Sequence, residues 1–210
     1  MTLTRPRDSA AEAFSRREAA GPTRCGRSSG LIAWTAVAAG LAAAALIFYW
    51  PVTIGGGIFT DYDLLVYFYP QQQYLGEQLR RGSLPLWNPY LFGGVPFLAN
   101  IQTGVFYPPN WITAVLPPPY ATTALTLFHA WLAAAGLVVL GRQLLGLGWA
   151  GALAAGVTFA FGGFLTQQAS HPNQLATAAW LPWLLVLYDR ARRPGGRLWV
   201  LPGCLAVAAL

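Results

Sequence analysis

The stretch LIAWTAVAAGLAAAALIFYW, residues 31–50, contains no charged side chain. A helix needs about 20 consecutive apolar residues to cross the hydrocarbon core of a bilayer, and this stretch has that length. It ends in the aromatic residues Phe48, Tyr49 and Trp50, which suit a membrane–water interface, and Pro51 follows. A cleaved signal peptide is the alternative, but its apolar core is shorter and is followed by small residues. We therefore expect a retained membrane-spanning helix.

Further apolar stretches predict more spans along the chain. A second span fits residues 121–140, a third fits 149–166, and a shorter fourth fits 174–188. A fifth starts at residue 198 and is still running at residue 210, which predicts a fragment or a truncated gene product. The expected fold class is an all-α membrane protein with several transmembrane helices.

The composition also indicates a membrane protein. The 210 residues are 55% hydrophobic and 10% charged, with a mean hydropathy of +0.45, whereas a soluble domain carries about 25% charged residues. The net charge of +6 raises the question of nucleic acid. The sequence has no basic stripe with interleaved aromatic residues, so we expect a lipid bilayer and no nucleic acid as partner. Cys25 and Cys204 predict neither a disulfide nor a metal site.

All the basic residues are arginines, and their distribution predicts the orientation in the membrane. Residues 1–30 are rich in arginine and lack apolar periodicity, so we expect a disordered cytoplasmic tail. The other loops on the same side hold Arg142, Arg190, Arg192, Arg193 and Arg197. The long loop on the opposite side holds only Arg80 and Arg81. Because arginine concentrates on the cytoplasmic side of membrane proteins, the N-terminus is predicted to be cytoplasmic.

That long extracytoplasmic loop, residues 51–120, far exceeds a usual connection between helices. It contains LPLWNPYLFGGVPF, residues 84–97, whose prolines and glycines cannot continue a helix through a bilayer. Because the loop is rich in aromatic and aliphatic residues, we expect it to be folded and to rest against the outer membrane face.

Part of this loop is expected to be helical. Residues 63–81 can form a helix after Pro70. Its apolar side would hold Tyr74, Leu75, Gln78 and Leu79. The pattern predicts an amphipathic helix at the membrane interface.

Acidic residues are scarce after the tail, and three of them, Asp61, Asp63 and Glu77, lie in the long loop. A carboxylate near the membrane interface of a protein with so few charges is a candidate functional group. It can accept a proton from an attacking hydroxyl, or it can help to hold a divalent cation such as Mg²⁺ or Mn²⁺. Asp61 or Asp63 can instead cap the helix that follows. Two residues allow one to cap while the other reacts.

Other polar residues are weaker candidates. His171, in the short second outer loop, can meet a substrate phosphate or a metal, although capping or packing is the more common role. His129 is expected to form a hydrogen bond with a neighbouring helix. Arg80 and Arg81 can bind phosphate oxygens or complement the dipole of the helix that they end. Asp189 is expected in a solvated turn beside arginines.

The sequence has no Walker loop, paired-cysteine zinc pattern, nucleophile elbow or GxGxxG motif. It does have a series of short motifs across residues 61–188. They are Asp63 with Tyr67-Phe68-Tyr69-Pro70, then Leu79-Arg80-Arg81-Gly82-Ser83-Leu84-Pro85-Leu86-Trp87-Asn88, then Gly93-Gly94-Val95-Pro96-Phe97, then Gln102 with Tyr107-Pro108-Pro109-Asn110-Trp111, and His171 with Ala179-Trp180-Leu181-Pro182. In this order the series resembles the bacterial YfhO-like membrane proteins, which belong to the GT-C glycosyltransferase superfamily.

The resemblance implies a GT-C-like fold and an enzyme of the bacterial inner membrane. Such an enzyme transfers a sugar from a polyprenyl-phosphate donor to an extracytoplasmic acceptor, with inversion at the anomeric carbon. An acidic residue early in the first outer loop acts as the base or lies beside the metal. By position this is Asp63, with Asp61 as its neighbour. The residues then expected to bind the substrate are Arg80, Arg81, His171, Trp87 and Asn88.

A non-catalytic membrane protein is the alternative. A transporter portion would place polar or ionisable residues within its spans near the midplane, where His129 is almost alone. An assembly subunit and an inactive remnant also stay open.

Overall fold

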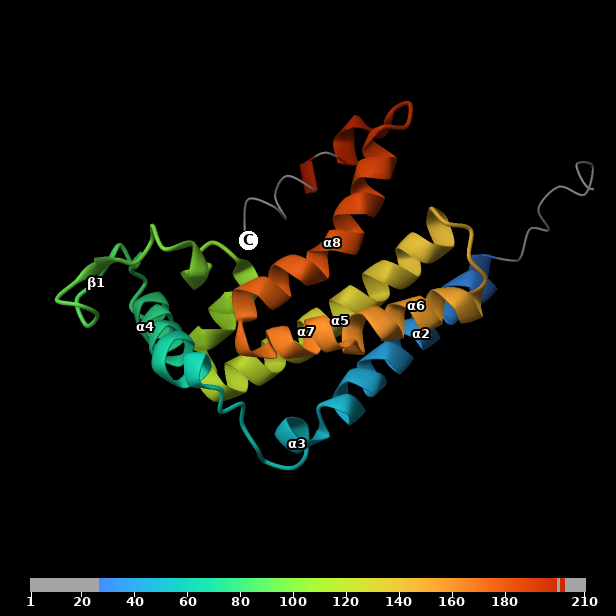
Figure 1. Ribbon diagram of the computed structural model, residues 1–210. Helices are drawn as coiled ribbons and strands as arrows, with labels where there is room; N and C mark the ends of the chain where they lie inside the picture. Colours follow the sequence, from blue (N-terminus) through green and yellow to red (C-terminus); the bar gives the residue numbers. More distant parts are fainter. Residues whose placement is uncertain (1–26, 200, 203–210) are drawn as a thin grey trace, which may run out of the picture. The chain divides into compact units, whose positions relative to one another are not determined.

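The structure is a computed structural model that describes residues 27–199, 201 and 202 (Figure 1). The described chain is mostly helical, as the apolar stretches predict. It divides into two compact units, residues 1–37 and 38–210, and we describe each by itself. Most of the predicted tail at 1–30 and most of the predicted fifth span at 198–210 lie outside the described residues.

The described part of the first unit is the start of helix α2 (Arg27–Phe48). In this part the hydroxyl of Thr35 donates to the carbonyl of Ile32, 3.0 Å away. From Gly30 to Phe48 the helix is long and apolar enough to cross a membrane. The predicted span at 31–50 is therefore helical up to Phe48, and a short helix, α3 (Trp50–Thr53), follows it.

The second unit holds the rest of α2 and two more helical stretches that are long and apolar enough to cross a membrane. One is α5 (Pro118–Gln143). The other, Trp149–Ser170, comprises α6 (Trp149–Phe161), α7 (Gly163–Gln167) and the 3-10 turn η4 (Gln168–Ser170). The indole of Trp131 on α5 donates to the carbonyl of Ala38 on α2, 3.0 Å away. Helices of this kind suit a lipid environment.

The central helix α5 packs against both α6 and α8 (Pro172–Ala191). A Cβ atom at Gly136 of α5 would lie 2.5 Å from Nε1 of Trp183 on α8, so the approach needs glycine. The indole of Trp183 donates instead to the carbonyl of Leu132, 2.8 Å away. This close approach is the packing expected of small residues between helices in lipid.

Helix α8 occupies the position of the predicted fourth span at 174–188. It is longer than predicted, with 20 residues, which corresponds to about 30 Å. It is less apolar than the three stretches above, because polar residues occupy both of its ends and Pro182 lies inside it. A short 3-10 helix, η5 (Gly196–Trp199), follows.

The segment between α3 and α5 is folded, as predicted. A π-helical turn, η1 (Leu64–Phe68), leads directly into α4 (Tyr69–Arg80). Pro70 has no amide proton to donate, and its ring crowds the carbonyl four residues earlier, so a wider π turn accommodates it. The helical segment therefore begins ahead of Pro70, rather than after it as predicted.

The predicted apolar side of α4 is covered by protein. Tyr74 and Leu75 form a buried cluster with Phe97 and Val105 from the segment that follows. Two 3-10 helices in that segment, η2 (Ile101–Thr103) and η3 (Pro108–Ala114), also contact α4. Tyr74 and Leu75 on this side are therefore covered by protein, and the position of α4 at the membrane interface stays a prediction.

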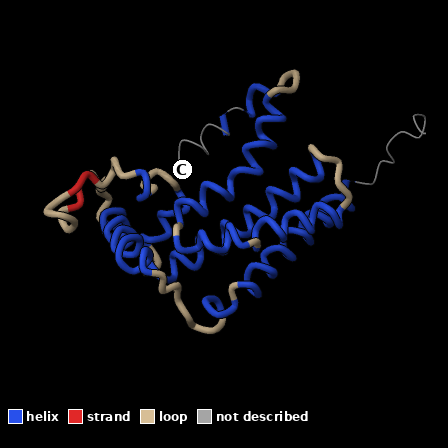
Figure 2. The backbone as a smooth tube through the Cα atoms, viewed as in Figure 1, coloured by secondary structure: helices blue, strands red, loops and turns tan. Residues whose placement is uncertain are grey.

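The stretch 84–97 forms a small hairpin, which contains the two strands of the described chain (Figure 2). Strand β1 (Trp87–Asn88) pairs antiparallel with β2 (Val95–Pro96). The hydroxyl of Tyr74 on α4 donates to the carbonyl of Trp87, 2.6 Å away. The hairpin is thus attached to α4. In Figure 1, α4 and β1 lie at one end of α5, and the turn between α5 and α6 lies at the other.

Candidate functional site

Two of the residues singled out in the sequence, Asp63 and His171, lie next to each other. Nε2 of His171 is 3.0 Å from Oδ2 of Asp63, although 108 positions separate the two residues. Asp63 directly precedes η1 and His171 directly precedes α8, so the contact joins the starts of two helical segments. Because an ionised carboxylate only accepts hydrogen bonds, Nε2 of His171 carries the proton of this bond.

Asp63 is the more accessible member of this pair. Its side chain is 51% exposed, compared with 33% for His171. Nδ1 of His171 is buried and has no hydrogen-bond partner among the described residues. The ring of Phe68 packs edge-on against the imidazole, with 6.2 Å between ring centroids. Asp63 can therefore meet a substrate, while His171 can hold its carboxylate in place.

Asp61 has the capping role. Its Oδ1 accepts a hydrogen bond from the backbone N–H of Asp63 at 3.1 Å, and its carbonyl accepts from the N–H of Leu65 at 3.1 Å. This is the local turn that aspartate commonly forms ahead of a helix. Of the two roles predicted for these carboxylates, capping falls to Asp61, and Asp63 stays available for the other.

A small pocket lies beside this pair. Its volume is about 30 Å³, and its lining includes Phe68, Pro172 and Asn173. Phe68 packs against His171, and Pro172 and Asn173 directly follow it in the chain. The other polar side chains of the pocket are Gln71, Gln72, Gln102, Thr103, Tyr107 and Asn110. None of the described residues that line it is charged. The pocket therefore suits a neutral polar group.

Gln71 has an unusual place in this lining. The residue is 4% exposed, and neither Oε1 nor Nε2 has a hydrogen-bond partner in the described part of the chain. Buried amides are nearly always paired, and an unpaired buried polar group costs about 1–3 kcal/mol. Oδ1 of Asn173 is likewise buried without a partner among these residues. Two residues of the lining thus hold one unused donor group and two unused acceptor atoms.

A polar network anchors one wall of the pocket to α5 and α8. The indole of Trp180 donates to the hydroxyl of Tyr107 at 2.9 Å, which leaves the hydroxyl proton for Nε2 of His129 at 2.7 Å. Nδ1 of His129 then donates to the carbonyl of Leu125, 2.7 Å away. Burial raises the pKa of Tyr107, against the lowering effect of the bond from Trp180. His129 therefore bonds a loop tyrosine and its own helix, rather than the neighbouring helix that we expected.

The two arginines predicted to bind substrate have other positions. Nη1 of Arg80 lies 3.3 Å from the carbonyl of Ala114 and 3.5 Å from that of Thr113, at the end of η3. Arg81 is the C-terminal cap of α4, and its side chain is exposed. Neither residue lines the pocket. A role in phosphate binding stays a prediction for both.

The hairpin residues also lie outside the lining of the pocket. Asn88 is 3% exposed, and its Oδ1 accepts a hydrogen bond from the N–H of Tyr90 at 3.0 Å. Its amide therefore shapes the turn. Trp87 is exposed and lies over Gly94, where a Cβ atom would be 2.6 Å from Nε1 of the indole. Substrate contact by Trp87 and Asn88 likewise stays a prediction.

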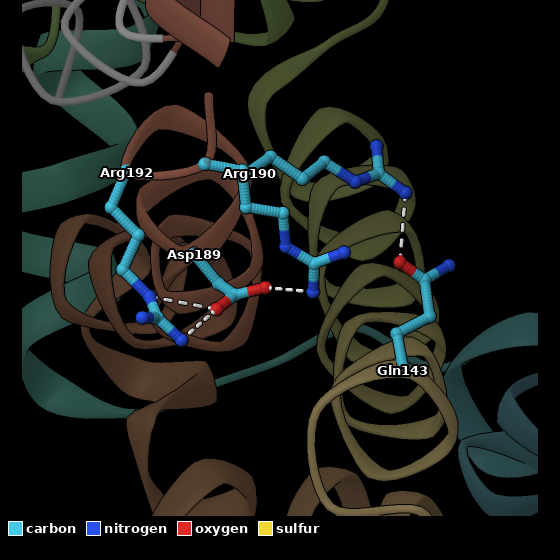
Figure 3. Close-up of polar contacts among 5 residues, drawn as sticks. Gln143, Asp189, Arg190 and Arg192 are labelled. Atoms are coloured by element: carbon cyan, nitrogen blue, oxygen red, sulfur yellow. Dashed lines mark hydrogen bonds and ion pairs between the residues drawn. The ribbon is translucent and has the colours of Figure 1, made fainter. Parts of the chain in front are cut away.

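The opposite end of α8 holds a second charged cluster (Figure 3). The carboxylate of Asp189 accepts from Nε of Arg192 at 2.9 Å and also pairs with Arg193. Nη2 of Arg190 reaches Oε1 of Gln143 at the end of α5, 2.8 Å away. The predicted solvated turn is wrong for Asp189, because its side chain is only 5% exposed. The arginine pairs compensate for that burial.

A metal at Asp61 and Asp63 also stays a prediction. Among the described residues, no group of three histidine, cysteine, aspartate or glutamate side chains is arranged to hold a metal ion. Asp61 is engaged in its turn, and Asp63 is bonded to His171. The residues present do not fit a metal site by themselves, so we derive no step through a metal.

The sequence analysis did not identify the pocket residues Gln71 and Asn173. The available signal was the density of amide side chains in a segment otherwise rich in apolar residues, with three glutamines in a row at 71–73. Comparison with known proteins finds no matching protein family, curated protein or solved structure.

Proposed function

We propose that the chain carries the acceptor-activating site of a membrane glycosyltransferase. The enzyme would transfer a sugar from a polyprenyl-phosphate donor to an extracytoplasmic acceptor. The contact between Asp63 and His171 is the observation that supports this proposal. An accessible carboxylate held by a histidine, at one end of apolar helices, suits a substrate whose lipid chain lies in the bilayer and whose sugar lies at its surface.

Asp63 acts as the general base in the proposed reaction. The acceptor hydroxyl gives its proton to Asp63 while its oxygen forms a bond to the anomeric carbon of the donor sugar. The bond between that carbon and the phosphate oxygen breaks, and polyprenyl phosphate leaves with the electron pair. This single displacement inverts the anomeric carbon. His171 is a positioning residue that binds Oδ2, which leaves Oδ1 of Asp63 for the acceptor.

We place Asp63 on the outer side of the bacterial inner membrane, with the N-terminus in the cytoplasm and several helices crossing. The contact between Arg190 and Gln143 supports this orientation. It joins the last turns of α5 and α8, which carry Arg142 and Arg190, at one end of these two helices. The positive-inside rule assigns that end to the cytoplasm. The start of α8, where His171 meets Asp63, then lies on the outer side.

A transfer assay in proteoliposomes tests the proposal. The full chain is supplied with radiolabelled polyprenyl-phosphate hexoses and membrane acceptors, beside liposomes without protein. General-base catalysis contributes about 10²–10⁴-fold, so Asp63→Asn is expected to lose at least about 100-fold in rate while inserting normally. Equal rates for wild type and Asp63→Asn, or no transfer above the protein-free liposomes, would favour a transporter or assembly role instead.

A further inference from the structure

We propose that the pocket beside Asp63 and His171 binds the hydroxymethyl arm of a neutral hexose. The inference rests on the proposed function and narrows its substrate class to sugars with an uncharged hydroxyl on C6. It depends on three features of the pocket: the unpaired amides, the absence of charge from its described lining, and its volume.

The unpaired amides match a hydroxyl group. Nε2 of Gln71 can donate a hydrogen bond, and Oε1 of Gln71 and Oδ1 of Asn173 can each accept one. A hydroxyl both donates and accepts, so it can use both kinds of atom at once. Gln71 is only 4% exposed. A ligand that forms hydrogen bonds with its amide therefore removes the free-energy cost of leaving that amide buried and unpaired.

The uncharged lining argues against ionic groups. A carboxylate, phosphate or ammonium group in this pocket would lose its hydration without meeting an opposite charge in the described lining. A sugar acid would therefore be rejected, and the donor's phosphate must lie elsewhere. A neutral hydroxyl carries no such penalty.

The volume limits how much of a sugar can enter. One water molecule needs at least about 10–15 Å³ in this measure, so about 30 Å³ accepts two water-sized groups. One carbon and one oxygen, the hydroxymethyl arm of a hexose, have that size, whereas a whole sugar ring does not. The ring would stay outside the volume that the lining residues enclose.

The connection to the reacting carboxylate runs through Phe68. Its ring lines the pocket and also packs against His171, which bonds Asp63. Asn173 belongs to the same turn, two residues after His171. An arm held by Gln71 and Asn173 would therefore keep the sugar beside the segment that carries Asp63.

Saturation-transfer NMR on the full chain in lipid nanodiscs tests the pocket. The probes are methyl glucoside, methyl xyloside, which lacks only the hydroxymethyl arm, and the methyl glycoside of glucuronic acid. We expect the glucoside to bind about tenfold or more tightly than the xyloside, as the loss of a buried hydrogen bond predicts, and the glucuronic acid derivative not to bind. Gln71→Leu should abolish the preference for the glucoside. Gln73→Leu, an exposed glutamine on the same helix, should keep it.

The outcomes separate this inference from the proposed function. Equal binding of glucoside and xyloside, or binding of neither, overturns the proposal that the pocket binds the hydroxymethyl arm, even if transfer depends on Asp63. A glucoside preference that is lost in Gln71→Leu supports hexose binding by the pocket even if no transfer occurs. Asp63→Asn should keep the preference while losing transfer. If Gln71→Leu fails to fold, Asn173→Ala provides the same test, and an unchanged preference in that variant overturns the inference.

Discussion

Nε2 of His171 lies 3.0 Å from Oδ2 of Asp63, and the two residues begin separate helical segments. Their side chains are 33% and 51% exposed, so this contact adds little to stability, typically about 0–1 kcal/mol for an exposed polar pair. An accessible carboxylate fixed by a distant residue is more useful for orienting a reacting atom than for holding the fold together.

The first prediction is that His171 acts through Asp63. His171→Gln keeps a neutral donor and should reduce transfer by about tenfold or less, whereas His171→Leu removes the donor and should reduce it further. In an Asp63→Asn background, His171→Leu should have almost no additional effect, because the group that it positions is already gone. The proteoliposome transfer assay measures the rates of wild type and of these four variants. If His171→Leu reduced the rate by the same factor in wild type and in Asp63→Asn, the result would contradict a positioning role for His171.

The second prediction concerns stability at Gln71. Replacing a buried amide whose atoms are unpaired should remove a cost of about 1–3 kcal/mol, so Gln71→Leu should raise Tm by a few degrees. The same variant should lose the glucoside preference, which is the trade between stability and function expected of a binding residue. Differential scanning fluorimetry in detergent measures Tm. The control Gln73→Leu, in an exposed position, should leave Tm nearly unchanged. A lower Tm for Gln71→Leu would show that its amide stabilises the fold.

The sequence predicts the helices well and their ends poorly. The spans expected at 121–140 and 174–188 are helical, but α5 begins at Pro118 and α8 at Pro172. Proline is tolerated in the first helical turn, where its missing amide proton is not needed. Hydropathy alone does not detect such starts, and it also misses polar helix ends such as Asp189 and Arg190.

The candidate site could be predicted only in part. Asp63 and His171 stand out because charged and titratable residues are rare in this chain. Their contact depends on tertiary packing across 108 positions, which no local pattern encodes. The pocket was missed for another reason: Gln71 resembles its neighbours in sequence, and only its burial without a partner distinguishes it.

The third prediction concerns acid stability at Asp189. Burial works to raise the pKa of Asp189, but the hydrogen bonds and charges of Arg192 and Arg193 outweigh it, so the pKa lies below its usual value. Because the pKa of Asp189 is lower in the folded state, its ionised carboxylate stabilises the folded protein. This contribution is fully present above the pKa of the unfolded state, about 3.9, and is lost as the pH falls through the pKa of the folded state. The Tm advantage of wild type over Asp189→Asn should therefore shrink below about pH 4. A constant difference between wild type and Asp189→Asn over this pH range would contradict the assigned pKa.

The fourth prediction concerns orientation. In a background in which Cys25 and Cys204 are replaced by serine, Ser83→Cys and Leu145→Cys place exposed thiols at the two proposed sides of the membrane. A membrane-impermeant maleimide should label Ser83→Cys in intact spheroplasts, and Leu145→Cys only after permeabilisation. The reverse pattern, or equal labelling of both without permeabilisation, would contradict the cytoplasmic N-terminus.

Comparison of Asp63→Asn with Asp61→Asn in the transfer assay tests the central claim most directly. The two carboxylates lie two positions apart, so both variants remove similar charge from the same segment. Because Asp61 forms a turn and Asp63 is the accessible partner of His171, we predict a loss of at least about 100-fold for Asp63→Asn and near wild-type transfer for a correctly folded Asp61→Asn. Undiminished transfer by Asp63→Asn would contradict its role as the base.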